Sequence, residues 1–199
     1  MIEKKEIIKE TKNWIFSILG AIFIAAVLNS KVFATVLVQQ SSMENTLYSS
    51  QKLILDKLSY NFVEPSRGDI IIFLKNKQRG TIIDDTVMFV NNIKPIFKNT
   101  DKNKRLVKRI IGIPGDEVNI KDGYVYINGE KINEPYTKGL TFSQKLKFPI
   151  NVPNDKLFVL GDNRPVSSDS RDFGLINYNQ LEGKAVFRIS PVNKIGTIN

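Results

Sequence analysis

Residues 118–132 read VNIKDGYVYINGEKI, in which Asp122-Gly123 and Asn128-Gly129 separate short runs rich in apolar and β-branched residues. Asp-Gly and Asn-Gly favour two-residue β-hairpin turns because both positions accept the positive φ that such turns require. This stretch therefore predicts short antiparallel strands that follow one another as a meander.

The chain after residue 31 has the same β character throughout. Residues 75–85 and 91–104 are polar and are expected to be loops or an exposed hairpin, and no long amphipathic helix or internal repeat is visible. We predict a mainly β protein with one antiparallel domain over residues 32–199, in which the meander is a small insert around 117–155. Apolar and β-branched runs predict the other strands at 32–40, 53–55, 70–73, 86–90, 106–113, 156–160 and 183–189.

An uncharged run of 17 residues extends from Trp14 to Ser30. A helix of that length spans roughly 25 Å, close to the bilayer core of about 30 Å, and we predict a transmembrane anchor at 14–31. Four lysines precede the run and one follows it directly, so the positive-inside rule places residues 1–13 in the cytoplasm and 32–199 outside the plasma membrane. A cleaved signal peptide is the competing interpretation, since the small residue Ala34 follows the run.

The composition excludes several kinds of chemistry. The 199 residues include no Cys and no His, which rules out a thiol nucleophile, disulfides, a histidine base and sites built on Cys or His ligands. The net charge of +9 is spread along the chain, and its densest run, at 102–109, is interpreted as a solvated loop that leads into a strand. A basic nucleic-acid binder is a remaining alternative, disfavoured by the extracytoplasmic placement.

Without Cys and His, a nucleophilic enzyme needs Ser or Thr as its nucleophile and Lys as its base. A lysine base must be neutral, and burial against apolar side chains lowers a lysine pKa because it disfavours the ammonium form. Lys108 lies in the apolar run 106–111. It and Arg109 are expected on opposite faces of a strand, one in the interior and the other in solvent. Candidate serines follow predicted strands at 41–42 and at 167–170.

Four segments, in this order after an N-terminal apolar run, resemble the type I signal peptidases, the membrane-bound Ser/Lys proteases that remove signal peptides. The resemblance covers about residues 14 to 190 and is greatest to the Gram-positive branch, which also has a single anchor and a compact insert. The matching residues are Ser42-Met43 with Thr46-Leu47, Arg67-Gly68-Asp69-Ile70-Ile71, Lys108 to Asp116, and Gly161 to Arg164 with Ser167, Asp169, Ser170 and Arg171.

By this resemblance Ser42 is the nucleophile and Lys108 the general base, and the hydroxyl of Ser167 orients the lysine. The resemblance also implies a supporting ion pair between Asp169 and Arg171, with the carboxylate of Asp162 beside it. The resemblance implies no metal and no cofactor.

The resemblance also implies how substrate binds. An extended signal peptide is expected to dock by β-augmentation, with small residues, commonly Ala, at the first and third positions before the cut. The implied partners are signal peptides of exported preproteins and the lipid bilayer, without nucleic acid, and the enzyme is expected to be a monomer. The residues expected to contact substrate are Val38, Gln39, Met43 and Leu106.

Two positions depart from the family pattern. Asn45 stands where Pro is usual, which predicts a less rigid turn after Ser42. Gln40 stands where Ser or Gly is common; its amide either supplies a second oxyanion donor or crowds the pocket. These departures favour the alternative of a catalytically weak, signal-peptidase-like factor that assists assembly of surface proteins such as pilins.

Two further matches are weighed against Ser42 and Lys108. Ser41 is the alternative nucleophile, and only the position of Met43 favours Ser42. Ser49-Ser50-Gln51-Lys52 fits the Ser-x-x-Lys pattern of penicillin-binding proteins, but the companion motifs of that family are absent from the sequence, so we interpret this match as chance.

Overall fold

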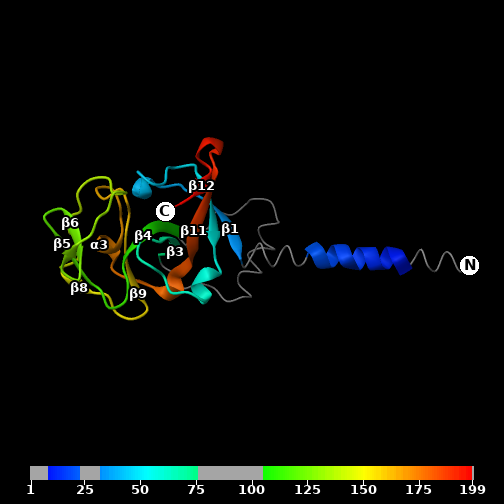
Figure 1. Cartoon of the computed structure of the whole chain (residues 1–199), viewed down its shortest axis with the longest axis horizontal. Coiled ribbons are helices and arrows are strands. Elements are labelled where there is room, and N and C mark those ends of the chain that lie inside the picture. The colour runs from blue at the N-terminus through cyan, green and yellow to red at the C-terminus, as the bar shows by residue number, and fades with distance from the viewer. Residues whose placement is uncertain (1–8, 23–31, 76–104, 199) are drawn as a thin grey trace, which may run out of the picture.

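The computed structural model describes residues 9–22, 32–75 and 105–198. The strand predicted at 86–90, and nearly all of the polar segments on either side of it, lie outside these residues. The main body contains two antiparallel sheets (Figure 1), and the smaller one lies at the end of the body farthest from β1 (Phe33–Leu37).

The larger sheet has eight strands in the order β1-β2-β11-β3-β4-β9-β10, with β12 paired to β11. All of its pairs are antiparallel, as the sequence predicts. Its other strands are β2 (Lys52–Asp56), β3 (Ile70–Leu74), β4 (Arg105–Gly112), β9 (Lys156–Leu160), β10 (Ile176–Asn177), β11 (Leu181–Ser190) and β12 (Gly196–Thr197). The two-residue strands β10 and β12 are too short to produce a recognisable pattern in the sequence.

The smaller sheet is the predicted meander, with a fourth strand added. Its order is β7-β6-β5-β8, formed by β5 (Glu117–Lys121), β6 (Tyr124–Ile127), β7 (Glu130–Lys131) and β8 (Ile150–Asn151). Asp122 and Gly123 have φ values of 53° and 83°, and Asn128 and Gly129 have 53° and 84°. Both bends therefore have the positive φ at two consecutive residues that the Asp-Gly and Asn-Gly sequences predict.

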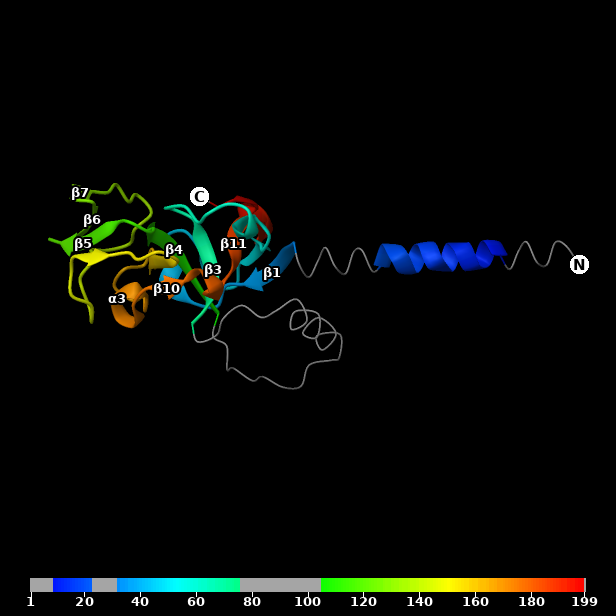
Figure 2. The ribbon, with the colours of Figure 1, turned by 90° about the horizontal axis from the view of Figure 1, so that it is seen from below.

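Strands β3 and β4 lie at the centre of the larger sheet (Figure 2). All five residues of β3 are buried, which explains its uninterrupted apolar sequence. Lys108 and Arg109 of β4 are exposed by only 1% and 2%. One of the two is in the interior as expected, but the expectation that the other is in solvent is wrong. The interpretation of the charged run as a solvated loop is wrong for these two residues.

An ion pair joins two of the segments that resemble the signal peptidases, residues 67–71 and residues 108–116. Arg67 donates from Nε to Asp116 Oδ2 at 2.8 Å, and its Nη2 contacts Oδ1. Asp116 also accepts from the backbone N–H of Ile113 at 2.9 Å and from Asn128 Nδ2 at 3.2 Å. Burial alone would raise the pKa of Asp116, but these hydrogen bonds hold it below its usual range. The contact fixes the turn at the end of β4.

The helical segments are short in the body of the protein. They comprise α3 (Ser170–Phe173) and the 3-10 turns η1 (Ser41–Met43), η2 (Ser59–Asn61), η3 (Tyr178–Gln180) and η4 (Val192–Lys194). Residues 9–22 form an exposed helix. Within the described parts of the chain, no helix combines the length and the apolar character needed to cross a bilayer. Residues 23–31 of the predicted anchor lie outside those parts.

Candidate active site

Ser42 lies in the turn η1, which follows the strand β1 as the sequence predicts for a nucleophile held at the end of a strand. Its side chain is 8% exposed. The carbonyl oxygen of Ser42 accepts from the backbone N–H of Asn163 at 3.0 Å, and that of Ser41 accepts from Asn163 Nδ2 at 3.1 Å. The loop after β9 therefore holds the turn that carries Ser42.

Lys108 reaches this turn from the middle of β4. Its Nζ lies 2.6 Å from Ser42 Oγ, within hydrogen-bond distance, and 3.0 Å from the carbonyl oxygen of Val107. The two residues are 66 positions apart in the chain. A buried amine in contact with a serine hydroxyl is the arrangement that allows a lysine to accept the serine proton.

The ion pair predicted between Asp169 and Arg171 is present and buried. Arg171 Nε and Nη2 bind the two carboxylate oxygens of Asp169, each at 2.8 Å. Asp169 Oδ2 also accepts from the backbone N–H of Gly161 at 3.0 Å, and Arg171 Nη2 donates to the carbonyl oxygens of Arg164 and Ser167. This pair thus fixes the loop that contains Ser167.

Ser167 is 2% exposed, and its Oγ has no hydrogen-bond partner within the described residues. Ser167 lies beside the turn that carries Ser42, because a Cβ added to Gly161 would overlap both Ser167 Oγ and the carbonyl oxygen of Ser42. Gly161 is therefore required for the close approach of these two segments.

Replacing Gly161 by Ala is expected to lower the free energy of unfolding by about 1–3 kcal/mol, the usual cost of overpacking. Gly196→Ala is a matched control, since an added Cβ there meets no atom within 4 Å. Chemical denaturation of both variants measures the difference. Equal stabilities for the two variants would show that Gly161 is not needed for this packing.

Asp162 is fully buried, and its partner is Arg109, a pairing that the sequence analysis did not anticipate. Arg109 Nε and Nη2 bind Asp162 at 3.0 and 2.9 Å, and Thr46 Oγ1 donates to Asp162 Oδ2 at 2.5 Å. The Arg109 guanidinium also lies 3.9 Å from the centre of the Tyr136 ring. Burial, together with the charge of Glu134, raises the pKa of Tyr136. Arg109 is buried because its charge is fully paired.

Arg164 is a second buried arginine near the site that was not predicted as a site residue. It binds Glu134 from Nη2 at 2.6 Å and the carbonyl oxygen of Gly161 from Nε at 3.0 Å. Only its position in the matching segment Gly161-Asp162-Asn163-Arg164 could have indicated from the sequence that Arg164 lies near the site.

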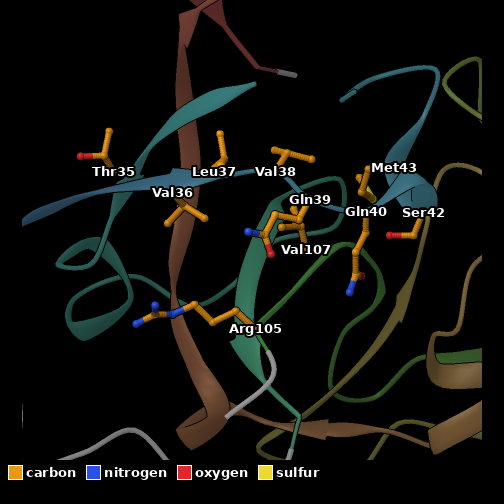
Figure 3. Close-up of a pocket in the computed structure, with 10 residues that line it drawn as sticks. All are labelled: Thr35, Val36, Leu37, Val38, Gln39, Gln40, Ser42, Met43, Arg105 and Val107. Atoms are coloured by element: carbon orange, nitrogen blue, oxygen red, sulfur yellow. The ribbon is translucent and has the colours of Figure 1, made fainter. Parts of the chain in front are cut away.

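A groove with a cavity volume of about 560 Å³ extends from Ser42 along the chain from residue 35 to residue 40. Figure 3 shows the residues that line this groove, which come from two parts of the chain, residues 35–43 and the β4 residues Arg105 and Val107. Of the residues predicted to contact substrate, Val38, Gln39 and Met43 line the groove. Leu106 does not line it.

Leu106 faces away from the groove because neighbouring residues of a strand point to opposite sides. It packs in the core cluster with Ile71, Phe73 and Ile110. Val107 and Arg105 occupy the groove instead. The candidate contact from β4 is therefore shifted by one residue.

The two departures from the family pattern are located as follows. Gln40 lines the groove beside Ser42. Asn45 has a φ of 97°, which Pro cannot adopt because its ring fixes φ near −65°. Asn45 Nδ2 instead donates to the carbonyl oxygen of Tyr136 at 3.0 Å. The sequence predicts a less rigid turn because Asn45 replaces Pro. In the structure a side-chain hydrogen bond from Asn45 holds this turn.

The family model and the similar proteins that cover most of this chain are all described as signal peptidases. Residues 11–190 match the family model described as signal peptidase, peptidase S26. Signal peptidase I of Bacillus caldolyticus is 35% identical, over 96% of each chain. Signal peptidase IB of Staphylococcus aureus is 30% identical, over 94% of this chain and 93% of that one. A crystal structure of a signal peptidase I from Enterococcus faecalis is 28% identical over 61% of this chain and 97% of that one, with a TM-score of 0.39.

Proposed function

We propose, since this chain belongs to the signal peptidase S26 family and is a serine-peptidase hydrolase, that it removes N-terminal signal peptides with Ser42 as nucleophile and Lys108 as general base. The observation that carries this proposal is the 2.6 Å hydrogen bond between Lys108 Nζ and Ser42 Oγ. The same contact favours an active peptidase over the alternative of a catalytically weak assembly factor.

The chemistry begins with attack of Ser42 Oγ on the carbonyl carbon of the scissile peptide bond, while Lys108 Nζ accepts the hydroxyl proton. The backbone N–H of Ser42 is proposed to stabilise the oxyanion, with Gln40, which lines the groove, as a candidate second donor. The C–N bond then breaks, and Lys108 returns the proton to the leaving amine. A water molecule, deprotonated by Lys108, then attacks the ester carbon; the ester C–O bond breaks, and Lys108 returns the proton to Ser42 Oγ.

The surroundings of Lys108 support its role as a base. An exposed lysine is protonated at neutral pH, whereas the side chain of Lys108 is 1% exposed, and burial disfavours the charged form. Ser167, whose buried Oγ is unpaired within the described residues, is proposed to orient the amine during the reaction. The loop that carries Ser167 is held in turn by three buried charged residues that do not contact Lys108 in the described hydrogen bonds: Asp162, Asp169 and Arg171.

The groove supports an extended substrate. Residues 35–37 belong to the edge strand β1 and residues 38–40 follow it, so a peptide laid along them would extend the sheet by β-augmentation. Val38 and Met43, two apolar residues that are 3% and 1% exposed, line the groove next to Ser42. We propose that small apolar residues, as in Ala-x-Ala, occupy the positions before the cut.

We further propose that residues 14–31 anchor the protein in the plasma membrane. The uncharged run from Trp14 to Ser30 and the lysines that precede it support a cytoplasmic N-terminus and an extracytoplasmic catalytic domain. Signal peptidase I enzymes are membrane-associated, which is consistent with this placement. We propose that the enzyme acts as a monomer.

The proposal is tested by incubating the detergent-solubilised full-length protein with an exported preprotein, beside its Ser42→Ala and Lys108→Ala variants. Mass spectrometry of the products locates the cut. Only the wild type is expected to cleave, after a small residue at the end of the signal peptide. Absence of cleavage by the wild type, or equal cleavage by all three proteins, would overturn the proposal.

A further inference from the structure

The turn that carries Ser42 contacts a distant part of the chain through Asn45. Asn45 Nδ2 donates to the carbonyl oxygen of Tyr136 at 3.0 Å and lies 3.5 Å from that of Thr137, although these residues are more than 90 positions away. With a φ of 97°, Asn45 adopts a backbone conformation that few residues other than Gly and Asn accept. The turn after Ser42 therefore depends on this residue in two ways, through its backbone and through its amide.

The segment bound by Asn45, residues 134–138, belongs to the small-sheet insert and is itself firmly held. The backbone N–H of Lys138 donates to the carbonyl oxygen of Asp162 at 2.8 Å, and the N–H of Arg164 donates to that of Lys138 at 3.1 Å. Arg164 also forms a buried ion pair with Glu134 at 2.6 Å. Residues 134–138 therefore form a rigid support, called here the brace.

The brace reaches the nucleophile from two sides. On one side Asn45 connects it to the turn 41–46. On the other side it is hydrogen-bonded to the loop 161–164, whose Asn163 N–H donates to the carbonyl oxygen of Ser42 at 3.0 Å. A third contact, between Lys138 Nζ and Glu44 Oε2 at 3.0 Å, is exposed and is expected to contribute little. The amide of Asn45 is thus the main link from the brace to the turn.

We propose that Asn45 is a positioning residue, which uses its hydrogen bonds to the brace to hold Ser42 Oγ in reach of Lys108 Nζ. The inference rests on the proposed roles of Ser42 and Lys108. Proton transfer requires the two heavy atoms to stay within hydrogen-bond distance, and a misplacement of about 1 Å can reduce a rate about 100-fold. The insert that contains the small sheet thereby contributes to catalysis through the brace. Among the described residues, none of the strands of the small sheet lines the groove.

Two variants test the role of the amide. Asn45→Gly accepts the positive φ but removes the amide, and Asn45→Asp keeps the shape but replaces the donor with an oxygen that faces two carbonyl oxygens. Both are expected to lower kcat for a signal-peptide substrate about tenfold or more. KM should stay within about twofold, because Asn45 does not line the groove.

Asn128→Gly is the matched control. Asn128 also has a positive φ, of 53°, and a hydrogen-bonded side chain, but its partners are Glu117 and Asp116 in and beside the small sheet. Loss of the Asn128 side chain should lower the stability of the fold about as much as the Asn45 substitutions do. It should leave kcat per folded molecule within about twofold of the wild type. Thermal unfolding of all variants supplies the folded fraction.

Each outcome decides the question. Wild-type kcat in both Asn45 variants, or an equal loss in Asn128→Gly, overturns the positioning role and leaves the proposed function intact. Cleavage by the wild type that survives Ser42→Ala overturns both, since Asn45 would then position a residue that does not react. A loss of kcat confined to the Asn45 variants establishes the inference.

Discussion

Ser42→Ala is expected to reduce kcat for signal-peptide cleavage by about 10⁴-fold or more, with KM nearly unchanged. Removal of a serine nucleophile leaves only the catalysis that binding and the oxyanion site supply, which is small beside the loss. The fold should be retained, since Ala removes only one hydroxyl, whose described partner is Lys108 Nζ. Steady-state kinetics and thermal unfolding on the same preparations separate the two effects.

Ser41→Ala is the control for this expectation. Ser41 is exposed, and it is the backbone carbonyl of Ser41, not its side chain, that accepts from Asn163. The variant should therefore keep kcat within about threefold. Peptide mapping of a trapped acyl-enzyme offers a second readout, because the ester should be found on Ser42. An ester on Ser41, or inactivity confined to Ser41→Ala, would exchange the roles of the two serines.

The hairpin turns could be predicted because the signal is local. Asp122-Gly123 and Asn128-Gly129 each specify a turn through two adjacent residues, and both turns are present. Strand β3 was also recognisable, since five consecutive buried residues leave an uninterrupted apolar run. The absence of His and Cys, together with its apolar neighbours, made Lys108 a candidate base, and the resemblance to the signal peptidases then implied that role.

The burial of Arg109 could not be predicted, because it depends on a partner elsewhere in the chain. Asp162 lies 53 positions away, and only the packing of β9 beside β4 brings the two charges together. A rule based on alternation alone places one of two adjacent charged residues in solvent, whereas both faces of β4 are buried at Lys108 and Arg109.

The choice of Leu106 as a substrate contact had a similar cause. Alternation separates Leu106 from Val107, but it does not say which face the groove occupies. That depends on where residues 35–40 lie over the sheet. Asn45 is a further example, because its amide binds the carbonyl oxygens of Tyr136 and Thr137, which lie in the insert more than 90 positions away.

Lys108→Arg is expected to abolish cleavage at every pH, a loss of about 10³-fold or more, although the positive charge is retained. The arginine guanidinium stays protonated and cannot accept the proton of Ser42. Because Lys108 is buried and Arg is larger, Lys108→Met provides a variant of similar volume that removes the base without adding bulk. Both should be inactive, and Lys108→Met should remain folded by thermal unfolding.

The pH profile of the wild type gives the complementary result. Activity should fall as the pH is lowered, because protonation of Lys108 removes the base, and it should be largely lost by about pH 5. Lys184→Arg is the control: Lys184 is ion-paired to Asp69 at 2.6 Å and is 37% exposed, so its replacement should keep both the rate and the profile. Undiminished activity at about pH 5, or substantial activity in Lys108→Arg, would show that a group other than the lysine amine accepts the serine proton.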